Sequence, residues 1–286
     1  MPDAHPHSSS PIVSRRTFLL GGALGGGLLL ADAFLREPHA VEVTTLALPL
    51  AKVPPGRELR LVQLSDLHMG AFSPYHQRIA QLVNAQRPDL IVLTGDFLEN
   101  RHNIGEVERF LSLLRAARGM VAVQGNWEYW TRMEGEVLRR HLKRAGATLL
   151  INQRQDLLLK DVPLSILGLD YPSPTDNLEQ LQKIAGADRL NILLSHVPAF
   201  DHGRLATDID LILCGHTHGG QVRFPFLPPP YLPRYSGHFV SGLFRVGADG
   251  TPLYVTRGIG TSVLPVRFLC RPEITVLRLQ PRARPV

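Results

Sequence analysis

Two kinds of segment alternate along the first half of the chain. Continuous apolar runs at residues 60–65, 89–94 and 120–123 are typical of buried strands. Between them, apolar residues recur at helical spacing over residues 74–86, 104–118 and 134–145. This alternation predicts βαβ units and a largely parallel sheet.

The pattern changes in the second half. Short runs at residues 148–151, 156–159 and 164–169 are separated by turns, so we expect antiparallel pairing to enter there. A short helix is predicted at residues 177–185, and Phe224–Pro233 must be an extended loop because it holds five prolines in ten residues. Further apolar strands are expected at residues 191–195, 210–214, 253–256 and 274–279. Residues 41–286 therefore read as one domain of two packed sheets with helices outside, in which residues 41–55 supply an initial strand or a linker.

The N-terminus has the layout of an export signal. Arg15 and Arg16 stand directly before Thr17-Phe18-Leu19-Leu20 and a glycine-rich apolar run, and this arrangement resembles the twin-arginine signal. A membrane-spanning helix is disfavoured, because Asp32 ends the run short of the roughly 20 apolar residues that a span needs. Ala31-Asp32-Ala33 offers a cleavage site, and a retained anchor is the alternative. We expect residues 1–40 to be a signal peptide or anchor, and the protein to be periplasmic or anchored facing outside.

Composition adds two constraints. The 286 residues are 44% hydrophobic and 20% charged, which is ordinary for a globular chain. The net charge of +6 is not gathered into a Lys/Arg run, so nucleic acid is not an expected partner. The two cysteines, Cys214 and Cys270, are expected to be free and inert.

Side chains that can bind metals follow five of the predicted strands. In a mainly parallel sheet the carboxyl ends of strands gather at one edge, where ligands bind. Each motif is weak alone, but carboxylate, imidazole and amide oxygen at five strand ends together predict a metal site. The candidate ligands are Asp66, His68, Asp96, Asn126, His196, His216 and His218.

The ordered motifs resemble those of the calcineurin-like metallophosphoesterase superfamily over about residues 57–279. They are Asp66-x-His68, Gly95-Asp96, Gly125-Asn126, His196 and Gly215-His216-x-His218. The resemblance implies a four-layered α/β/β/α sandwich. Three further stretches are similar to the exported or membrane-associated bacterial branch, which includes relatives acting on UDP-2,3-diacylglucosamine in lipid A synthesis: Gly219-Gly220-Gln221, Arg257–Gly260 and Arg267–Glu273.

The same resemblance implies two divalent metal ions. One would be held by Asp66, His68, Asp96 and His218, and the other by Asp96, Asn126, His196 and His216, with Asp96 as the bridge. Mixed oxygen and nitrogen ligands without cysteine suit Mn, Fe or Zn. The implied activity is hydrolysis of phosphomonoester, phosphodiester or pyrophosphate bonds by a hydroxide that bridges the ions. Asp96, Asn126 and His196 would be the catalytic residues, and Asn126 and Trp127 would bind the substrate.

One position departs from the family pattern. Trp127 follows Asn126 where family members have a histidine that protonates the leaving group, and indole cannot deliver a proton at neutral pH. Three interpretations stay open. The substrates have good leaving groups, another residue such as His102 or His238 is the acid, or the chain binds metal and ligand with little turnover. Glu99 replaces an aspartate of the second motif but keeps the carboxylate.

Aromatic residues next to the ligands suggest a large or amphiphilic substrate. Trp127, Tyr129 and Trp130 lie beside the third motif, and the loop Phe224–Pro233 follows the last ligands. Such a rim can hold acyl chains or sugar rings, and core packing under a long loop is the competing interpretation. We expect a phosphorylated small molecule or lipid as substrate, with membrane association as a further expectation, and infer no protein partner.

If Arg15 and Arg16 direct export, changing both to lysine should leave the protein in the cytoplasm, because the twin-arginine signal is defined by that pair. Cell fractionation with detection of the full chain measures this. Undiminished export of the double variant would exclude the twin-arginine route.

Overall fold

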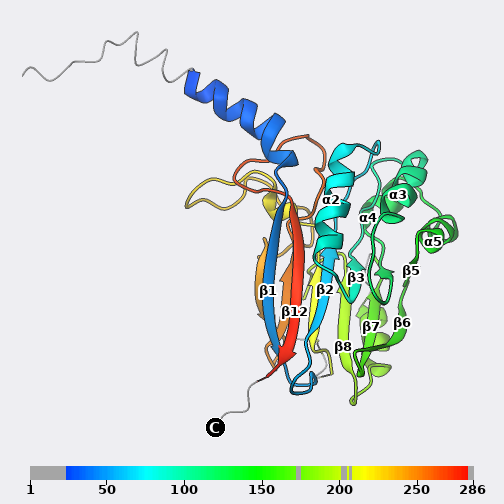
Figure 1. The fold of residues 1–286 in the computed structure, drawn as a ribbon. Helices are drawn as coiled ribbons and strands as arrows, with labels where there is room; N and C mark the ends of the chain where they lie inside the picture. The colour runs from blue at the N-terminus through cyan, green and yellow to red at the C-terminus, as the bar shows by residue number, and fades with distance from the viewer. Residues whose placement is uncertain (1–23, 172–174, 201–204, 206–207, 283–286) are drawn as a thin grey trace, which may run out of the picture.

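A computed structural model describes residues 24–171, 175–200, 205 and 208–282. The pair Arg15-Arg16 lies outside the described residues. The described residues form two six-stranded sheets that pack face to face, with helices on the outside (Figure 1).

The first sheet has the strand order β1, β12, β2, β3, β4, β5. All neighbours in it run parallel except β12 and β2, which are antiparallel. The initial segment is therefore a strand rather than a linker. The bounds are β1 (Glu42–Leu50), β2 (Leu59–Leu64), β3 (Leu90–Leu93), β4 (Met120–Ala122), β5 (Ala147–Leu149) and β12 (Glu273–Pro281).

The second sheet has the order β10, β11, β9, β8, β7, β6. Its four central strands are parallel, and the hairpin partners β10 and β6 are antiparallel at the two edges. The edge strand β10 was not predicted, because alternate residues of it are exposed and its apolar run is short. The bounds are β6 (Gln153–Leu159), β7 (Val162–Leu169), β8 (Leu190–Ser195), β9 (Leu211–Cys214), β10 (Gly242–Val246) and β11 (Thr251–Val255).

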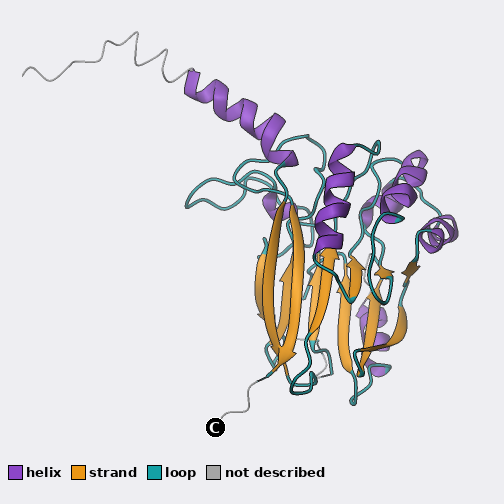
Figure 2. Ribbon diagram, viewed as in Figure 1, coloured by secondary structure: helices purple, strands orange, loops and turns teal. Residues whose placement is uncertain are grey.

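Alternation of side chains along the strands produces three apolar layers. In β2, Leu61 faces the second sheet and Val62 faces the outer helices; in β3, Leu90 and Ile91 divide in the same way. The helices α2 (Pro74–Ala85), α3 (Ile104–Leu111) and α5 (Gly135–Arg144) cover the first sheet, and α6 (Thr175–Lys183) covers the second (Figure 2). The predicted four-layered α/β/β/α sandwich is confirmed.

The helix predicted at residues 104–118 is shorter than expected. It ends at Leu111, because Asn84 of α2 takes over the backbone groups that a longer helix would use. Its amide nitrogen donates to the Leu113 carbonyl at 2.9 Å, and its amide oxygen accepts the N–H of Arg115 at 2.8 Å. Apolar periodicity continues beyond this point, but a side chain from a neighbouring helix competes successfully for the backbone.

The described N-terminal segment is helical and leads away from the sandwich (Figure 1). Residues 24–31 are α-helical, and they continue through a π-helical turn at Asp32–Arg36 and a 3-10 turn at Glu37–His39 into β1. Ala33 and Glu37 are buried against the domain. Within the described residues, no helix is both long and apolar enough to cross a membrane.

A surface ion pair before β2 gives a pH-dependent prediction. Glu58 accepts two hydrogen bonds from Arg278, at 3.1 and 2.7 Å, and one from Gln280, and these donors lower its carboxyl pKa to about 2. Since the folded-state pKa lies below the unfolded value, this stabilisation is present above about pH 4.5 and is lost as pH falls through about 2. Glu58→Gln should lower the free energy of unfolding by roughly 0.5–1 kcal/mol at pH 7, and the difference should shrink in acid.

Urea unfolding of both proteins at several pH values measures the effect. Glu136→Gln is the matched control, because the Glu136 side chain is 79% exposed on α5. A Glu58→Gln effect that does not depend on pH would show that the pair contributes through packing and not through charge.

Candidate metal centre

The seven predicted ligands meet at one edge of the sandwich. Each lies in the loop that follows a parallel strand, or in the first turn after it: β2, β3 and β4 in the first sheet, and β8 and β9 in the second. Because the carboxyl ends of these strands point the same way, the two sheets bring their loops face to face. All seven side chains belong to buried residues: Asp66, His68, Asp96, Asn126, His196, His216 and His218.

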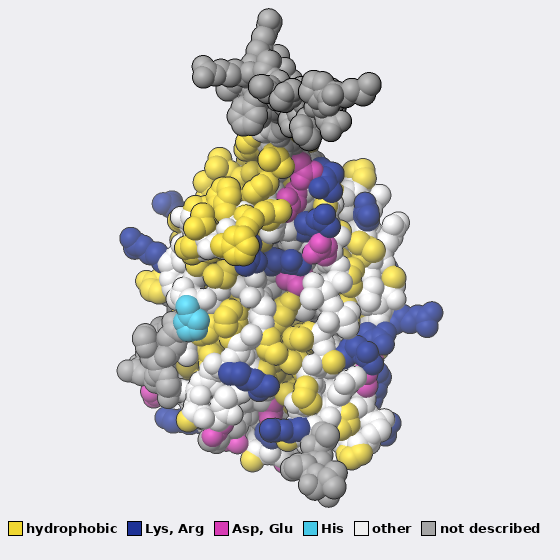
Figure 3. Space-filling view, turned by 90° about the vertical axis from the view of Figure 1, so that its left-hand side faces the viewer, with side chains coloured by type: hydrophobic (Ala, Val, Ile, Leu, Met, Phe, Trp, Pro, Cys, Tyr) yellow, Lys and Arg dark blue, Asp and Glu magenta, His cyan; other side chains and the backbone are white. Residues whose placement is uncertain are grey.

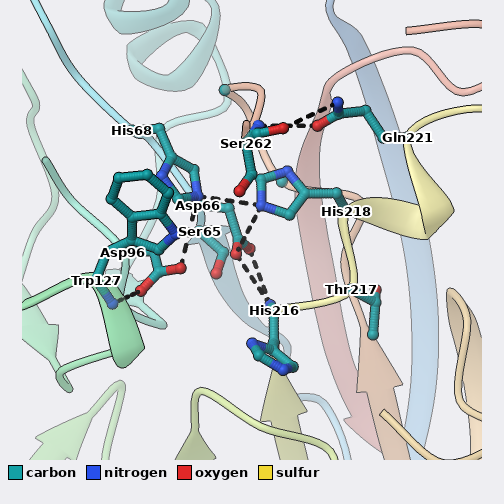
Figure 4. A network of polar contacts seen from close by, with 12 residues as sticks. Ser65, Asp66, His68, Asp96, Trp127, His216, Thr217, His218, Gln221 and Ser262 are labelled. Carbon is teal, nitrogen blue, oxygen red and sulfur yellow. Dashed lines mark hydrogen bonds and ion pairs between the residues drawn. The ribbon is translucent and has the colours of Figure 1, made fainter. Parts of the chain in front are cut away.

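The first group of ligands surrounds His68 and His218 (Figure 4). Their Nε2 atoms are 3.1 Å apart. The carboxylate of Asp66 lies 3.5 Å from Nε2 of His218, and that of Asp96 lies 3.5 Å from Nε2 of His68. The ligand-type atoms of Asp66, His68 and His218 lie within 4.8 Å of one another, close enough to hold one metal ion together.

The second group surrounds Asn126. Its amide oxygen is 3.1 Å from Nε2 of His196 and 2.9 Å from Nδ1 of His216, and these two ring nitrogens are 3.2 Å apart. Nδ1 of His196 lies 2.7 Å from the Thr94 carbonyl, so the ring donates there and leaves Nε2 as the free ligand atom.

Asp96 lies between the two groups. The same carboxylate oxygen, Oδ2, is 3.5 Å from Nε2 of His68 and 3.3 Å from Nε2 of His196. Asp66 also lies within 4.8 Å of members of both groups, but its nearest imidazole is that of His218. Asp96 thus lies close to an imidazole of each group, and its bridging role stays a prediction.

The electrostatics of this edge favour a bound cation. Burial raises the pKa of Asp66 to about 6 and lowers the pKa of His68 to about 4. Burial would also lower the pKa of His196, but the Asp96 carboxylate outweighs it and raises that pKa to about 9. The neutral His68 ring beside carboxylates can bind a divalent ion directly, whereas the His196 ring would release its proton when an ion binds. Among the described residues, Nδ1 of His68 and of His218 has no hydrogen-bond partner.

Comparison with known proteins agrees with this geometry. Residues 59–220 match the family model described as calcineurin-like phosphoesterase. The chain belongs to the calcineurin-like phosphoesterase family. It is 35% identical over 291 residues to the uncharacterized metallophosphoesterase YkuE of Bacillus subtilis, covering 94% of this chain and 98% of that protein. It is 32% identical over 232 residues to the phosphodiesterase YaeI of Escherichia coli, covering 77% of this chain and 82% of that protein.

Solved structures of low sequence identity resemble the chain more distantly. An archaeal phosphodiesterase is 15% identical, with a TM-score of 0.38, covering 70% of this chain and 84% of that one. The phosphopantetheinyl hydrolase of Mycobacterium tuberculosis is also 15% identical, with a TM-score of 0.43, covering 74% of this chain and 96% of that one.

Strained and crowded backbone holds the metallophosphoesterase site in place. Five ligands have positive φ angles, which non-glycine residues rarely adopt. Gly125 packs against Asp96 so closely that a Cβ atom would lie 2.2 Å from its Oδ1. The ligand positions are therefore fixed by the fold and not by side-chain rotation alone. The five are Asp66 (52°), His68 (41°), Asp96 (55°), His216 (74°) and His218 (52°).

Glu128 is a structural partner of the site to which sequence reasoning assigned no role. It lies on the short helix α4 (Asn126–Trp130) and is fully buried. Its carboxylate accepts the backbone N–H groups of Asp96, Phe97 and Gly125 at 3.1, 2.8 and 2.7 Å. It therefore ties the loop after β3 to the loop after β4. Only the place of Glu128, two residues after Asn126, could have indicated this role. The spacing does not show in which direction its side chain points.

Trp127 contacts the metal centre without supplying a ligand. Its backbone N–H donates to Oδ1 of Asp96 at 2.8 Å, and its indole lies edge-on to the His68 ring with centroids 4.9 Å apart (Figure 4). Neither His102 nor His238, the two candidate acids, lines the cavity beside the site.

A cavity of about 500 Å³ opens from the centre. Ligand side chains form one end of it, namely Asp96, Asn126, His216 and His218. Aromatic and aliphatic side chains form most of the rest. These are Trp127, Trp130, Val222, Pro230, Tyr231, Pro233, Val263, Leu264 and Val266. Core packing does not explain Trp130, which is 65% exposed. The aromatic and proline segments therefore border the site.

If Asp96 bridges two ions, Asp96→Asn should lower the metal content from about two ions per chain to well below one, because both groups lose a charged ligand. Asn126→Ala should retain about one ion, since the group around His68 stays complete. Elemental analysis of both purified variants, with circular dichroism to check folding, measures this. Equal metal content in the two variants would exclude a bridging role for Asp96.

Proposed function

We propose that this metallophosphoesterase uses two divalent ions to hydrolyse phosphomonoester, phosphodiester or pyrophosphate bonds outside the cytoplasm, in substrates drawn from lipid or cell-envelope intermediates. The observation that carries the proposal is the pair of ligand groups that share Asp96 at one end of an open cavity. Mixed nitrogen and oxygen donors favour Mn, Fe or Zn as the native ions.

Two ions bound there would offset charge on the phosphoryl oxygens and lower the pKa of water. Neighbouring groups of the chain orient the residues that would hold these ions. The Thr94 carbonyl fixes the tautomer of His196, and the Asp66 carboxylate accepts the backbone N–H of His216 at 3.0 Å. Asn126 presents its amide oxygen to the second group. Its amide nitrogen is then the group available to donate to a phosphoryl oxygen of the substrate.

Hydrolysis adds water across one P–O bond: an oxygen from water bonds to phosphorus, and the leaving oxygen departs with the electron pair. In the described part of the chain, the cavity is lined by no histidine other than His216 and His218 and by no carboxyl group other than Asp96. The leaving oxygen therefore has no obvious proton donor. We infer that the preferred substrates have good leaving groups, as pyrophosphates and aryl diesters do. The phosphodiesterase activity named for YaeI is compatible with this class.

A catalytically weak binding protein is the second candidate. The replacement of an acid by Trp127 favours it, since general acid catalysis is typically worth about 10²–10⁴-fold. Such a protein would keep both ions and bind a phosphorylated ligand with little turnover. The location outside the cytoplasm rests on the Arg15-Arg16 motif and the apolar run that follows it.

The leaving-group hypothesis predicts that wild-type rates depend steeply on the pKa of the leaving alcohol. Aryl phosphate esters should be cleaved much faster than alkyl esters, because the leaving oxygen departs with its charge uncompensated. Trp127→His should raise alkyl-ester turnover most, by up to about 10²-fold if general acid catalysis is regained. The measurement is kcat/KM across a series of phosphodiesters with Mn²⁺ present.

Metal content is the control for this series, because Trp127 is not a ligand and its replacement should leave both ions bound. A shallow dependence in the wild type would mean that an acid is present after all. Absence of turnover for every ester by the metal-loaded protein would favour the binding protein.

A further inference from the structure

Three segments far apart in the sequence expose many apolar side chains at one end of the sandwich, and two of them also line the cavity. They are residues 24–36, 224–235 and 262–269, and we call their exposed apolar side chains together the apolar face. Most of the exposed large hydrophobic side chains of the described residues lie in it. They are Leu24, Leu28, Leu29, Leu30, Phe34, Leu35, Phe224, Phe226, Leu227, Tyr231, Tyr235, Val263, Leu264 and Leu269.

Hydrogen bonds join the N-terminal helix to the rest of this face. The Ala33 carbonyl accepts the N–H of Arg267 at 2.9 Å, and the buried Glu37 carboxylate accepts the N–H of Cys270 at 2.6 Å. These contacts fix the C-terminal end of the helix beside residues 262–269. The helix then projects from the same end of the sandwich as the loop that contains residues 224–235 (Figure 1).

Contacts also join the loop that contains residues 224–235 to the loop that contains residues 262–269. The Phe268 carbonyl accepts the N–H of Arg223, and the Phe224 and Phe268 rings lie 5.8 Å apart. The Gln221 amide donates to the carbonyls of Ser262 and Leu264 at 3.2 and 3.0 Å. The apolar side chains therefore gather on one side of the molecule, where Figure 3 shows a continuous hydrophobic area.

The composition of the face favours a lipid bilayer over a protein partner. Residues 24–31 read Leu-Gly-Gly-Gly-Leu-Leu-Leu-Ala and are exposed all round, with no polar side. A protein groove would cover one side of such a helix, whereas a bilayer covers every side. In the sequence the uncharged run extends back to Phe18, which makes it too short for a span of roughly 20 residues but long enough for insertion into one leaflet.

The proline-rich loop has the properties of a membrane-inserting element. Phe226 and Leu227 lie between Pro225 and Pro228; Phe226 is fully exposed, and Leu227 is 65% exposed. Prolines restrict the backbone, so the loop can present apolar side chains without a large loss of conformational entropy on insertion. Tyrosines at its base, Tyr231 and Tyr235, suit the boundary between headgroups and acyl chains.

We propose that the apolar face docks on a lipid bilayer, with the cavity mouth toward the lipid, and that the substrate is an amphiphile. Its phosphoryl group would reach the metal centre while its apolar part stays in the bilayer or in the cavity. Val263 and Leu264 belong to both the cavity lining and the apolar face, so the two are continuous there. The docking stands independently of the activity, whereas the substrate class rests on the proposed phosphoesterase function.

Co-sedimentation of the full chain with phosphatidylcholine–phosphatidylglycerol vesicles tests the docking. The wild type should sediment with the vesicles. The triple variant Phe226→Ser, Leu227→Ser, Leu269→Ser should bind at least about 10-fold more weakly, although none of these residues lines the cavity. Leu113→Ser with Leu158→Ser is the matched control, since both are exposed outside the three segments, and it should bind as the wild type does.

Two synthetic diesters separate docking from catalysis. The triple variant should hydrolyse soluble bis-p-nitrophenyl phosphate at the wild-type rate. It should hydrolyse p-nitrophenyl hexadecyl phosphate in vesicles at least about 10-fold more slowly than the wild type does. If neither protein hydrolyses the soluble diester, the proposed function fails while vesicle binding still decides the docking.

Wild-type and triple-variant chains that bind vesicles equally would overturn the docking surface. A wild type that stays unbound and forms a dimer, which the triple variant disrupts, would assign the face to a second copy of the chain. A wild type that stays unbound and monomeric would also overturn the proposal. Equal loss of activity on both diesters would show that the triple variant damages the site itself.

Discussion

The meeting of the two sheets at the metal centre is the constraint on which the rest of the structure depends. Gln63 of the first sheet donates to the hydroxyl of Thr94 and to the carbonyl of Cys214, which ends β9 in the second. The His196 ring reaches back to Thr94 in the same way. The ligand cluster is thus part of the contact between the sheets, so a bound cation would offset buried charge and stabilise the sandwich itself.

Much of the fold and site follows from the sequence for physical reasons. Buried parallel strands must be continuous apolar runs, and their carboxyl ends must share an edge, so ligand-type residues after five runs implied one site. The features missed depend on contacts between distant segments. The end of α3 at Leu111 needs Asn84, and the role of Glu128 needs the backbone of Phe97. Neither leaves a periodic signal in the chain.

The N-terminal segment is a second case in which contacts between distant residues are invisible in the sequence. Its apolar run and charged end suggested a signal or an anchor, and both rest on composition alone. The contacts of Ala33 and Glu37 add something that composition cannot. They show that the cleavage motif Ala31-Asp32-Ala33 is helical and that its last residue, Ala33, is buried against the domain. Cleavage after Ala33 would remove a carbonyl that accepts the N–H of Arg267. Cleavage there would therefore cost the folded domain this contact.

At residue 127 the backbone and the side chain have different roles: the backbone contacts a candidate metal ligand, and the side chain determines whether an acid is present. The contact that it makes with Asp96 is through its backbone N–H, and any residue other than proline can make it. The side chain is then free to change without disturbing the ligands, and here an indole occupies the space beside His68 where the family has an acid. An exchange at this position can therefore remove an acid and leave the candidate ligands in place. The proposed preference for good leaving groups rests on this separation between the backbone contact and the side chain of residue 127.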